Sequence, residues 1–276
     1  MDWVELLKDY HGKDLDSRKT WYGSVVDVYN RVRPRYPLQI IARVVELAQL
    51  FDRAHILELG CGPGIATLPF AQLGFSLHSL EPNQEAAQIA KDNCANYPNV
   101  EIQNISFEEW ELEYDRFDAV LAATSWHWIT PEVAYSKTVA ALKENGWLIL
   151  LWNTPPHPSD EICQRLDHVY DDLNSAIPIY ARYEDRETHT EHFRKFGQDL
   201  IDSSCFKDLV YEYLVCEVTY SIDDYLALLS TLSAYIALES YQRDALFDQL
   251  KTQLEKVCGD LIPLSYLSAF HVAQKI

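Results

Sequence analysis

Three glycines and two carboxylates have the spacing of a site for an adenosine cofactor. In the stretch LELGCGPG, Gly60, Gly62 and Gly64 alternate directly after an apolar run. Glycines allow the backbone to turn sharply and to approach a ligand without an intervening Cβ. Glu58 precedes the first glycine by two positions, and Glu81 ends the next apolar run. A carboxylate about 20 residues after such a loop can accept hydrogen bonds from both ribose hydroxyls.

The first of these carboxylates favours one adenosine cofactor over another. A dinucleotide fingerprint, GxGxxG, would need its third glycine where this chain has Ile65. At an effective dielectric constant near ~20, a carboxylate at Glu58 and a pyrophosphate ~4 Å away would repel each other by roughly 4 kcal/mol. S-adenosylmethionine has a sulfonium, an ammonium and no phosphate, so Glu58 would attract it. Glu81 suits the ribose of either cofactor, and an NAD-dependent oxidoreductase stays open as an alternative.

Alternating elements are predicted to place this loop at one edge of a sheet. Strand patterns occur at residues 54–59, 75–80, 100–105, 117–123 and 146–152, and helical patterns at 37–50, 65–73, 82–97 and 131–143. This order predicts βαβ units and a mostly parallel sheet covered on both faces, with its ligand beyond the carboxyl ends of the strands. A helical stretch at 222–257 separates two later strands, 209–220 and 265–274, and we expect it to form a lid.

Composition limits the classes of partner. The chain has 276 residues and a formal net charge of −19, which favours a single domain over residues 1–276 and disfavours nucleic acid and anionic membranes as partners. The six cysteines are scattered without a CxxC pair, so we expect free thiols and no metal site. The N-terminal residues do not have the pattern of a signal peptide, and no apolar run is long enough for a membrane span. We therefore expect a cytoplasmic protein and leave its oligomeric state open.

Several of these segments together resemble a known family. ILELGCGPG, SLEPN and FDAVLAATSWHWI resemble successive motifs of class I S-adenosylmethionine-dependent methyltransferases, over roughly residues 25–152. YNRVRPRYP and TLSAY are similar to segments of its small-molecule group, methyltransferase type 11, which includes trans-aconitate methyltransferases. The resemblance implies an α/β Rossmann-like three-layer sandwich with a seven-stranded, mostly parallel sheet whose last strand is antiparallel. It also implies a helical cap, formed by residues of about 1–36, 155–200 and 221–258.

The resemblance further implies which residues hold the cofactor. Glu81 would bind the ribose, and Arg33 of an N-terminal lid would pair with the methionine carboxylate. Ser106 stands where the family often has an acidic residue beside the adenine, and Ala122 would lie beneath the cofactor at the end of the fourth strand. The full set is Tyr29, Arg33, Glu58, Gly60, Cys61, Gly62, Gly64, Glu81, Pro82, Ser106, Phe107 and Ala122.

Aromatic residues beyond the fourth and fifth strands are candidates for the substrate pocket. Ligand sites are mostly apolar with a few polar groups, which favours pocket lining over simple packing for the WHW segment. His127 is the candidate catalytic residue, although a buried histidine is often only structural. The candidate substrate contacts are Tyr22, Trp126, Trp128, Trp152 and Tyr235. The arginines at 31, 33 and 35 form either a solvated face or a carboxylate-binding group.

These observations predict methyl transfer from S-adenosylmethionine to a small molecule. The resemblance favours a carboxylic acid as the acceptor, and a carboxylate needs no general base. An amine or a phenol would need one, with His127 or a cap tyrosine as the candidate. Two alternatives remain at this stage: a protein that binds S-adenosylmethionine without catalysis, and the NAD-dependent oxidoreductase.

Overall fold

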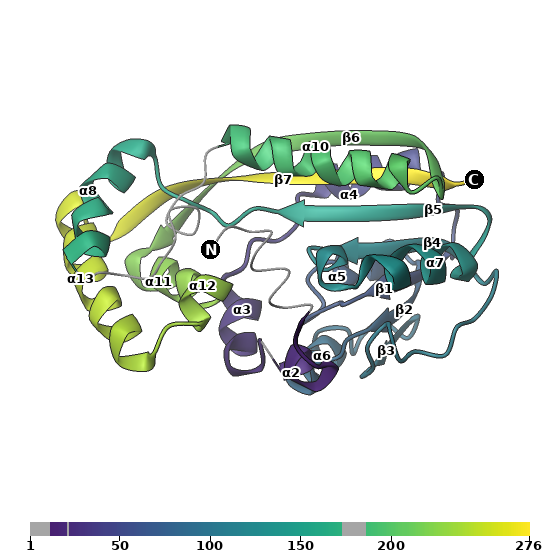
Figure 1. The fold of residues 1–276 in the computed structure, drawn as a ribbon, viewed down its shortest axis with the longest axis horizontal. Coiled ribbons are helices and arrows are strands. Elements are labelled where there is room, and N and C mark those ends of the chain that lie inside the picture. The colour runs from purple at the N-terminus through teal and green to yellow at the C-terminus, as the bar shows by residue number, and fades with distance from the viewer. Residues whose placement is uncertain (1–11, 21, 173–185) are drawn as a thin grey trace.

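A seven-stranded sheet forms the centre of the computed structural model, which describes residues 12–20, 22–172 and 186–276. The strands are β1 (His55–Leu59), β2 (Ser76–Leu80), β3 (Val100–Gln103), β4 (Phe117–Ala123), β5 (Leu142–Asn153), β6 (Phe206–Ser221) and β7 (Leu261–Lys275). Their order is β3-β2-β1-β4-β5-β7-β6 (Figure 1). Strands β1 to β5 pair in parallel, whereas β7 is antiparallel to both of its neighbours. The predicted sheet, with its last strand antiparallel, is confirmed.

Helices connect the strands and differ in places from the predicted ranges. The first group comprises α2 (Leu15–Thr20), the short 3-10 helix η1 (Gly23–Val25), α3 (Val26–Val32), α4 (Leu38–Leu47), α5 (Thr67–Gln72), α6 (Gln84–Asn93) and α7 (Pro131–Ala141). The helix expected over 131–143 ends at Ala141, because Leu142 already pairs with Phe117 as the first residue of β5. The later helices are α8 (Asp160–Asp172), α10 (Arg186–Asp202), α11 (Ile222–Ser230), α12 (Ser233–Ile236) and α13 (Ser240–Cys258). Residues 222–257 thus form three helices instead of a nearly continuous one.

Each face of the sheet has its own apolar core. Successive side chains of a strand point to opposite faces, so Ile56 packs with α4 and α5 while Leu57 lies on the other face. That second face packs against α7 and, through residues such as Phe193, against α10. The resulting three layers explain why the strands of the centre read as nearly continuous apolar runs.

A third apolar core lies beyond the end of β5. Strands β6 and β7 have 16 and 15 residues, so each spans about 50 Å. Figure 1 shows both strands extending past β5 to the helices α8, α11 and α13. Leu166, Leu250 and Ile262 are among the buried residues that these helices and strand ends share. We call the helices α8, α11, α12 and α13 the cap, and they lie at the edge of the sheet where the parallel strands end.

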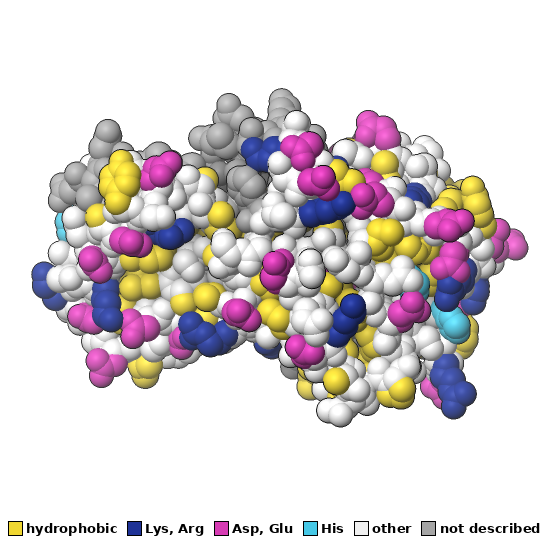
Figure 2. All heavy atoms as spheres, turned by 90° about the horizontal axis from the view of Figure 1, so that it is seen from below, with side chains coloured by type: hydrophobic (Ala, Val, Ile, Leu, Met, Phe, Trp, Pro, Cys, Tyr) yellow, Lys and Arg dark blue, Asp and Glu magenta, His cyan; other side chains and the backbone are white. Residues whose placement is uncertain are grey.

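The surface and the cysteines add further facts. Acidic and basic side chains are interspersed on the face shown in Figure 2, and neither sign forms a continuous stripe there. All six cysteines are free thiols. Within the described ranges, no helix combines the length and apolar character that crossing a bilayer requires. The same part of the chain contains no group of three or more histidine, cysteine, aspartate or glutamate side chains placed to hold a metal ion.

Candidate functional site

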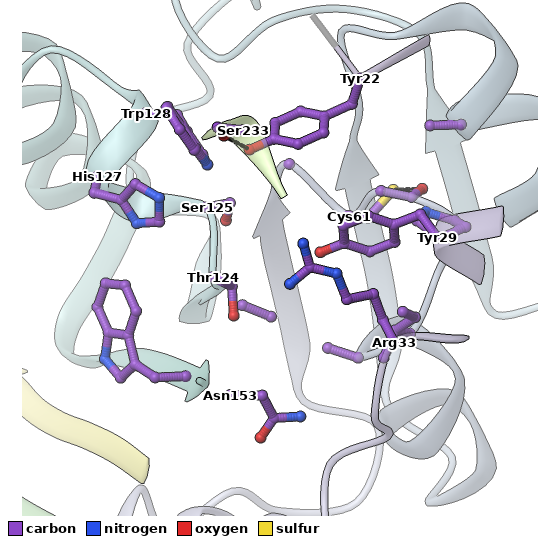
Figure 3. Close-up of a pocket in the computed structure, with 18 of the residues that line it drawn as sticks. Tyr22, Tyr29, Arg33, Cys61, Thr124, Ser125, His127, Trp128, Asn153 and Ser233 are labelled. Atoms are coloured by element: carbon purple, nitrogen blue, oxygen red, sulfur yellow. Dashed lines mark hydrogen bonds between the residues drawn. The ribbon is translucent and has the colours of Figure 1, made fainter. Parts of the chain in front are cut away.

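A cavity of about 400 Å³ opens where β1, β2, β4 and β5 end. Its walls come from the glycine loop, the segments after β2, β3, β4 and β5, the N-terminal helices α2 and α3, α10, and the cap helices α11 and α12. Small-molecule sites have volumes of ~300–1,000 Å³. In Figure 3, Tyr29 and Arg33 enter from one side, His127 and Trp128 from the other, and Thr124 and Ser125 lie between them.

The glycine loop needs glycine at its first position. Gly60 has a φ of +65°, and a Cβ there would lie 2.9 Å from the Cβ of Ser125. The backbone N–H of Cys61 donates to the carbonyl of Leu80 over 3.0 Å, which fixes the loop against β2. Of the loop residues predicted to contact the cofactor, three line the cavity: Gly60, Cys61 and Gly62. Gly64 does not line it and faces Ala90 of α6 instead.

Glu81 lies at the end of β2 and faces the cavity from beneath the loop. Its carboxylate accepts hydrogen bonds from the backbone N–H groups of Gly62 and Asn83, each over 2.8 Å. Burial raises the pKa of Glu81 to about 7, although both hydrogen bonds oppose this shift. Each carboxylate oxygen keeps a second lone pair, so the group can still accept hydrogen bonds from a ligand's hydroxyls. Pro82, also a predicted contact, lines the cavity beside it.

Glu58 lies within β1 and is not part of the cavity wall. The carboxylate is fully buried and accepts hydrogen bonds from the hydroxyls of Thr67 and Ser79, each over 2.7 Å. Burial raises the pKa of Glu58 to about 7. The structure therefore places this carboxylate under the loop, where it joins β1, β2 and α5, instead of at the ligand edge where the sequence analysis expected it.

Ser106 and Phe107, the predicted adenine contacts, line the cavity after β3. The ring of Phe107 stacks on Trp110, with centroids 6.1 Å apart and planes 19° apart. Ser106 donates to the carboxylate of Glu109 over 2.8 Å. The hydroxyl is therefore engaged within its own turn, and the Phe107 ring packs between Trp110 and Lys137, whose Nζ lies 5.3 Å from its centre.

Helix α2 closes the same half of the cavity through ion pairs. Arg18 lies 3.3 Å from the carboxylate of Glu108, and Lys19 lies 2.9 Å from that of Glu109. The amide of Asn83 donates to the carbonyl of Lys19 over 3.0 Å. The sequence analysis did not identify Arg18, Lys19 and Asn83 as site residues, because isolated charges near a terminus usually indicate a solvated surface.

Arg33 is the one arginine of the 31, 33 and 35 group that lines the cavity. Its guanidinium donates to Thr231 Oγ1 over 2.9 Å and to the Thr231 carbonyl over 2.8 Å, and it lies 4.7 Å from the centre of the Tyr29 ring. Among the described residues no carboxylate pairs with Arg33. Arg31 pairs with Asp224, and Arg35 donates to the carbonyl of Asn30 over 2.6 Å. The arginines are thus divided between the cavity and the surface.

The floor of the cavity lies one to three residues beyond Ala122. Ala122 is fully buried in the sheet, and the cavity is lined by Ala123, Thr124 and Ser125 instead. Thr124 has a φ of +56°, and its hydroxyl hydrogen-bonds with that of Tyr36 over 2.9 Å. The expectation for Ala122 is corrected because the chain turns out of the sheet only after β4 ends at Ala123.

The WHW segment divides between the core and the cavity. It forms the 3-10 helix η2 (Trp126–Trp128), in which successive side chains point ~120° apart because a turn takes about three residues. Trp126 packs edge-on against Tyr135 in the core, with centroids 5.5 Å apart, and does not line the cavity. His127 and Trp128 do line it, as predicted.

Trp152 and helix α10 complete an aromatic wall beside His127. The Trp152 ring is 4.7 Å from Phe196 and 5.7 Å from His127, with interplanar angles of 20° and 24°. Phe193 lies 6.1 Å from Trp152 and also lines the cavity. Trp152 was predicted as a substrate contact. Phe193 and Phe196 were not identified, since their spacing on a helix is equally typical of ordinary core packing.

The two tyrosines proposed as substrate contacts differ in placement. Tyr22 lines the cavity, and its hydroxyl hydrogen-bonds with Ser233 over 2.8 Å. Desolvation raises the pKa of Tyr22 to about 12. Tyr235 is fully buried in the cap and hydrogen-bonds with Tyr170 over 2.9 Å, so its expected contact with the substrate is corrected. The neighbouring Leu232, Ser233 and Ala234 line the cavity in its place.

Comparison with known proteins agrees with this architecture. Residues 56–146 match the family model described as a methyltransferase domain. An uncharacterized methyltransferase of Mycobacterium bovis is 32% identical over 133 residues, which are 48% of this chain and 52% of that protein. An uncharacterized methyltransferase-like protein of Schizosaccharomyces pombe is 31% identical over 137 residues, 49% of this chain and 52% of that protein. The chain thus spans about half the length of the curated relatives it matches.

A solved structure extends the likeness to most of the fold. It is described as a candidate type II methyltransferase from Anaeromyxobacter dehalogenans, and it superposes with a TM-score of 0.63 at 20% identity, covering 88% of this chain and 97% of that one. Residues 56–146 thus match a methyltransferase domain, and most of the chain shares the Rossmann-like fold of this solved structure.

Proposed function

We propose that this chain transfers a methyl group from S-adenosylmethionine to a small carboxylic acid. The observation that carries the proposal is the cavity itself, in which the glycine loop and Glu81 form one end and aromatic side chains form the other. A cavity of about 400 Å³ between the sheet and the cap suits a small molecule better than a macromolecule. The net charge of −19 also argues against nucleic acid as the acceptor. The free thiols support a cytoplasmic location.

The residues at the loop end fit the cofactor. The carboxylate of Glu81 suits the ribose hydroxyls, and the absence of a Cβ at Gly60 lets the loop lie against Ser125. Phe107 lines the cavity where the adenine would lie. Arg33 is a cation without a carboxylate partner in the described part of the chain, and it suits the carboxylate of the methionine portion.

Methyl transfer to a carboxylate requires no general base beside the acceptor. When bound, S-adenosylmethionine would supply a methyl group on a sulfonium sulfur. A carboxylate oxygen would bond to this methyl group, and the electron pair of the broken S–C bond would stay on sulfur. The products would be a methyl ester and S-adenosylhomocysteine, with no net proton transfer. The protein then needs only to hold the acceptor in line and to exclude water.

The acid–base groups of the cavity are consistent with this view. Tyr22 is a poor general base because its pKa is raised to about 12, and burial raises the pKa of Tyr36 above its usual range as well. His127 therefore remains the one candidate base from the sequence analysis. Its proposed role with a carboxylate is to contact and orient the acceptor, and with a phenol or an amine it would accept a proton.

Calorimetric titration tests the cofactor part of the proposal. We expect S-adenosylmethionine and S-adenosylhomocysteine to bind with micromolar dissociation constants, and NADH not to bind. Glu81→Ala is expected to weaken both by roughly tenfold or more, because it removes a charged hydrogen-bond acceptor. Glu132→Gln, an exposed carboxylate outside the cavity, is the matched control and should leave binding unchanged.

An acceptor panel then separates the remaining alternatives. Formation of S-adenosylhomocysteine with carboxylic acids, followed by mass spectrometry of the methyl ester, would support the proposal. Binding without turnover on a broad panel of acids, amines and phenols would indicate a non-catalytic binding protein. Binding of NADH alone would contradict the proposal and support an oxidoreductase.

A further inference from the structure

The half of the cavity opposite the glycine loop has a distinct lining. We call it the acceptor compartment and define it by His127, Trp128, Trp152, Phe193 and Phe196, all of which line the cavity. Helix α10 supplies the two phenylalanines, the end of β5 supplies Trp152, and η2 supplies His127 and Trp128. Three elements far apart in the sequence therefore bring aromatic rings to one wall.

Trp152 stacks with Phe196 and His127 in this wall, whereas Phe193 is tilted by 37° from Trp152 and Trp128 by 52° from His127. The plane of Trp152 is 20° from that of Phe196 and 24° from that of His127. Trp152 is only 4% exposed, so its orientation is fixed by the surrounding core. Stacked rings cover each other's faces, so the accessible ring surface of this stack belongs to Phe196, which is only partly buried, and a flat ring gains offset-stacking contacts there that a puckered ring of the same size does not.

Charge around the compartment disfavours a cationic acceptor. Among the described residues that line the cavity, the carboxylates are Glu81 and Glu108, and both belong to the half that contains the loop and the segment after β3. Toward the aromatic wall the cavity is lined by the imidazoles of His127, His157, His189 and His192. An ammonium group would be buried there without a carboxylate partner, which is costly.

Building on the methyl transfer proposed above, we propose that the acceptor is a flat aromatic or conjugated carboxylate. Its ring would lie against Phe196, and its carboxylate would point to the open centre of the cavity. Figure 3 shows His127 and the guanidinium of Arg33 facing this centre from opposite sides. The ring of Phe196 favours a planar body, and the lack of a carboxylate among the described residues of this half of the cavity favours an anion over a cation.

Matched acids test the planar part of this proposal. Benzoate and cyclohexanecarboxylate have the same number of carbon atoms and the same charge, and they differ in planarity. We expect trans-cinnamate and benzoate to bind the protein saturated with S-adenosylhomocysteine at least about fivefold more tightly than cyclohexanecarboxylate, as measured by calorimetry. Benzylamine tests the charge and is expected to bind more weakly than benzoate. Mass spectrometry should detect methyl trans-cinnamate once S-adenosylmethionine is supplied.

Two variants connect the preference with the wall. Phe196→Leu keeps an apolar side chain but removes the ring, and it should weaken trans-cinnamate binding about fivefold to tenfold while leaving S-adenosylhomocysteine binding unchanged. Phe51→Leu is the control, since Phe51 is 60% exposed and lies outside this cavity. Thermal unfolding of both variants identifies any general loss of stability.

The outcomes distinguish the inference from the proposed function. Equal binding of cyclohexanecarboxylate and benzoate, or tighter binding of the polyacid trans-aconitate, would overturn the inference and leave methyl transfer intact. Tighter binding of benzylamine would overturn its charge component. Failure of S-adenosylhomocysteine to bind would contradict the proposed function, and the inference would fall with it.

Discussion

The indole N–H of Trp152 donates a hydrogen bond to Nδ1 of His271 over 3.0 Å. An indole can only donate, so this contact requires Nδ1 to accept and places the imidazole proton on Nε2. Nε2 then donates to the carbonyl of Phe193 over 2.8 Å. Burial lowers the pKa of His271 to about 4, which keeps the ring neutral at physiological pH. His271 of β7 thereby joins β5, which carries the aromatic wall, to α10, which completes it.

Replacing His271 by leucine is expected to disturb both stability and acceptor binding. The variant leaves the buried indole N–H of Trp152 and the carbonyl of Phe193 without their partner, at a cost of about 1–3 kcal/mol for such a group. Urea unfolding at pH 7 measures the loss of stability. If His271 positions the wall, the KM for the acceptor rises while the affinity for S-adenosylhomocysteine changes little.

His55→Leu is the control for this prediction because His55 is exposed at the start of β1. It should change neither quantity. His271→Gln, which keeps an acceptor and a donor, should restore part of the KM effect. A loss of stability with an unchanged acceptor KM would show that His271 supports the fold without positioning the wall.

The buried carboxylate of Glu81 predicts a pH-dependent stability for the unliganded protein. Its pKa is raised from 4.5 to about 7 by burial, so the folded state favours the protonated form. The stabilising contribution is therefore fully present below pH 4.5 and is lost as the pH rises through about 7. A difference of this size corresponds to roughly 3 kcal/mol.

The comparison with Glu81→Gln isolates this contribution from the other acidic groups of the chain. We expect the free energy of unfolding of the wild type, relative to the variant, to fall between pH 5 and pH 8. Chemical denaturation across that range measures it, with Glu132→Gln as a surface control. Curves that stay parallel for wild type and Glu81→Gln would contradict the raised pKa.

Gly60→Ala is expected to be more damaging than another substitution at a glycine of positive φ. An alanine at Gly60 would strain a backbone at φ +65° and place its Cβ 2.9 Å from that of Ser125. Gly74 has a φ of +88°, but a Cβ at this position would have no heavy atom within 4 Å, so Gly74→Ala carries the backbone strain alone. That strain costs roughly 1–2 kcal/mol.

Calorimetry and thermal unfolding of the two variants separate the effects of strain and contact. Gly74→Ala should lower the melting temperature slightly and leave S-adenosylhomocysteine affinity unchanged. Gly60→Ala should lower both, because Ser125 or the loop must shift to admit the methyl group. Equal melting temperatures and equal S-adenosylhomocysteine affinities of the two variants would show that the contact between Gly60 and Ser125 does not affect the site.

Local patterns in the sequence predicted the central parallel strands and residues at one end of the cavity, whereas the seven-stranded sheet with its last strand antiparallel was implied by the family resemblance. The period of the apolar residues predicted strands 117–123 and 75–80 to within a residue of β4 and β2. Gly60, Gly62 and Glu81 could be identified because backbone turns and a strand-end carboxylate depend on neighbours within a few residues or on the adjacent strand. These parts of the site are set by local geometry.

Other side chains could be placed only by the tertiary structure. Glu58 lies under the loop, where hydroxyls of α5 and β2 donate to one of its carboxylate oxygens, and Tyr235 lies in the core of the cap with Tyr170. Trp126 and Trp128 have the same type and nearly the same position, yet the turn of η2 sends one into the core and the other to the cavity. No local sequence pattern distinguishes a side chain in the core from one at the cavity in this segment.

The sequence by itself determined the class of fold, the order of its central elements and the loop that suits an adenosine cofactor. Only the tertiary structure decided the other end of the cavity, where Phe193 and Phe196 of α10 meet Trp152 of β5. The physical reason is that helical periodicity shows which residues share a face but not what that face contacts. That contact depends on His271 of β7, which hydrogen-bonds with both Trp152 of β5 and the carbonyl of Phe193 in α10.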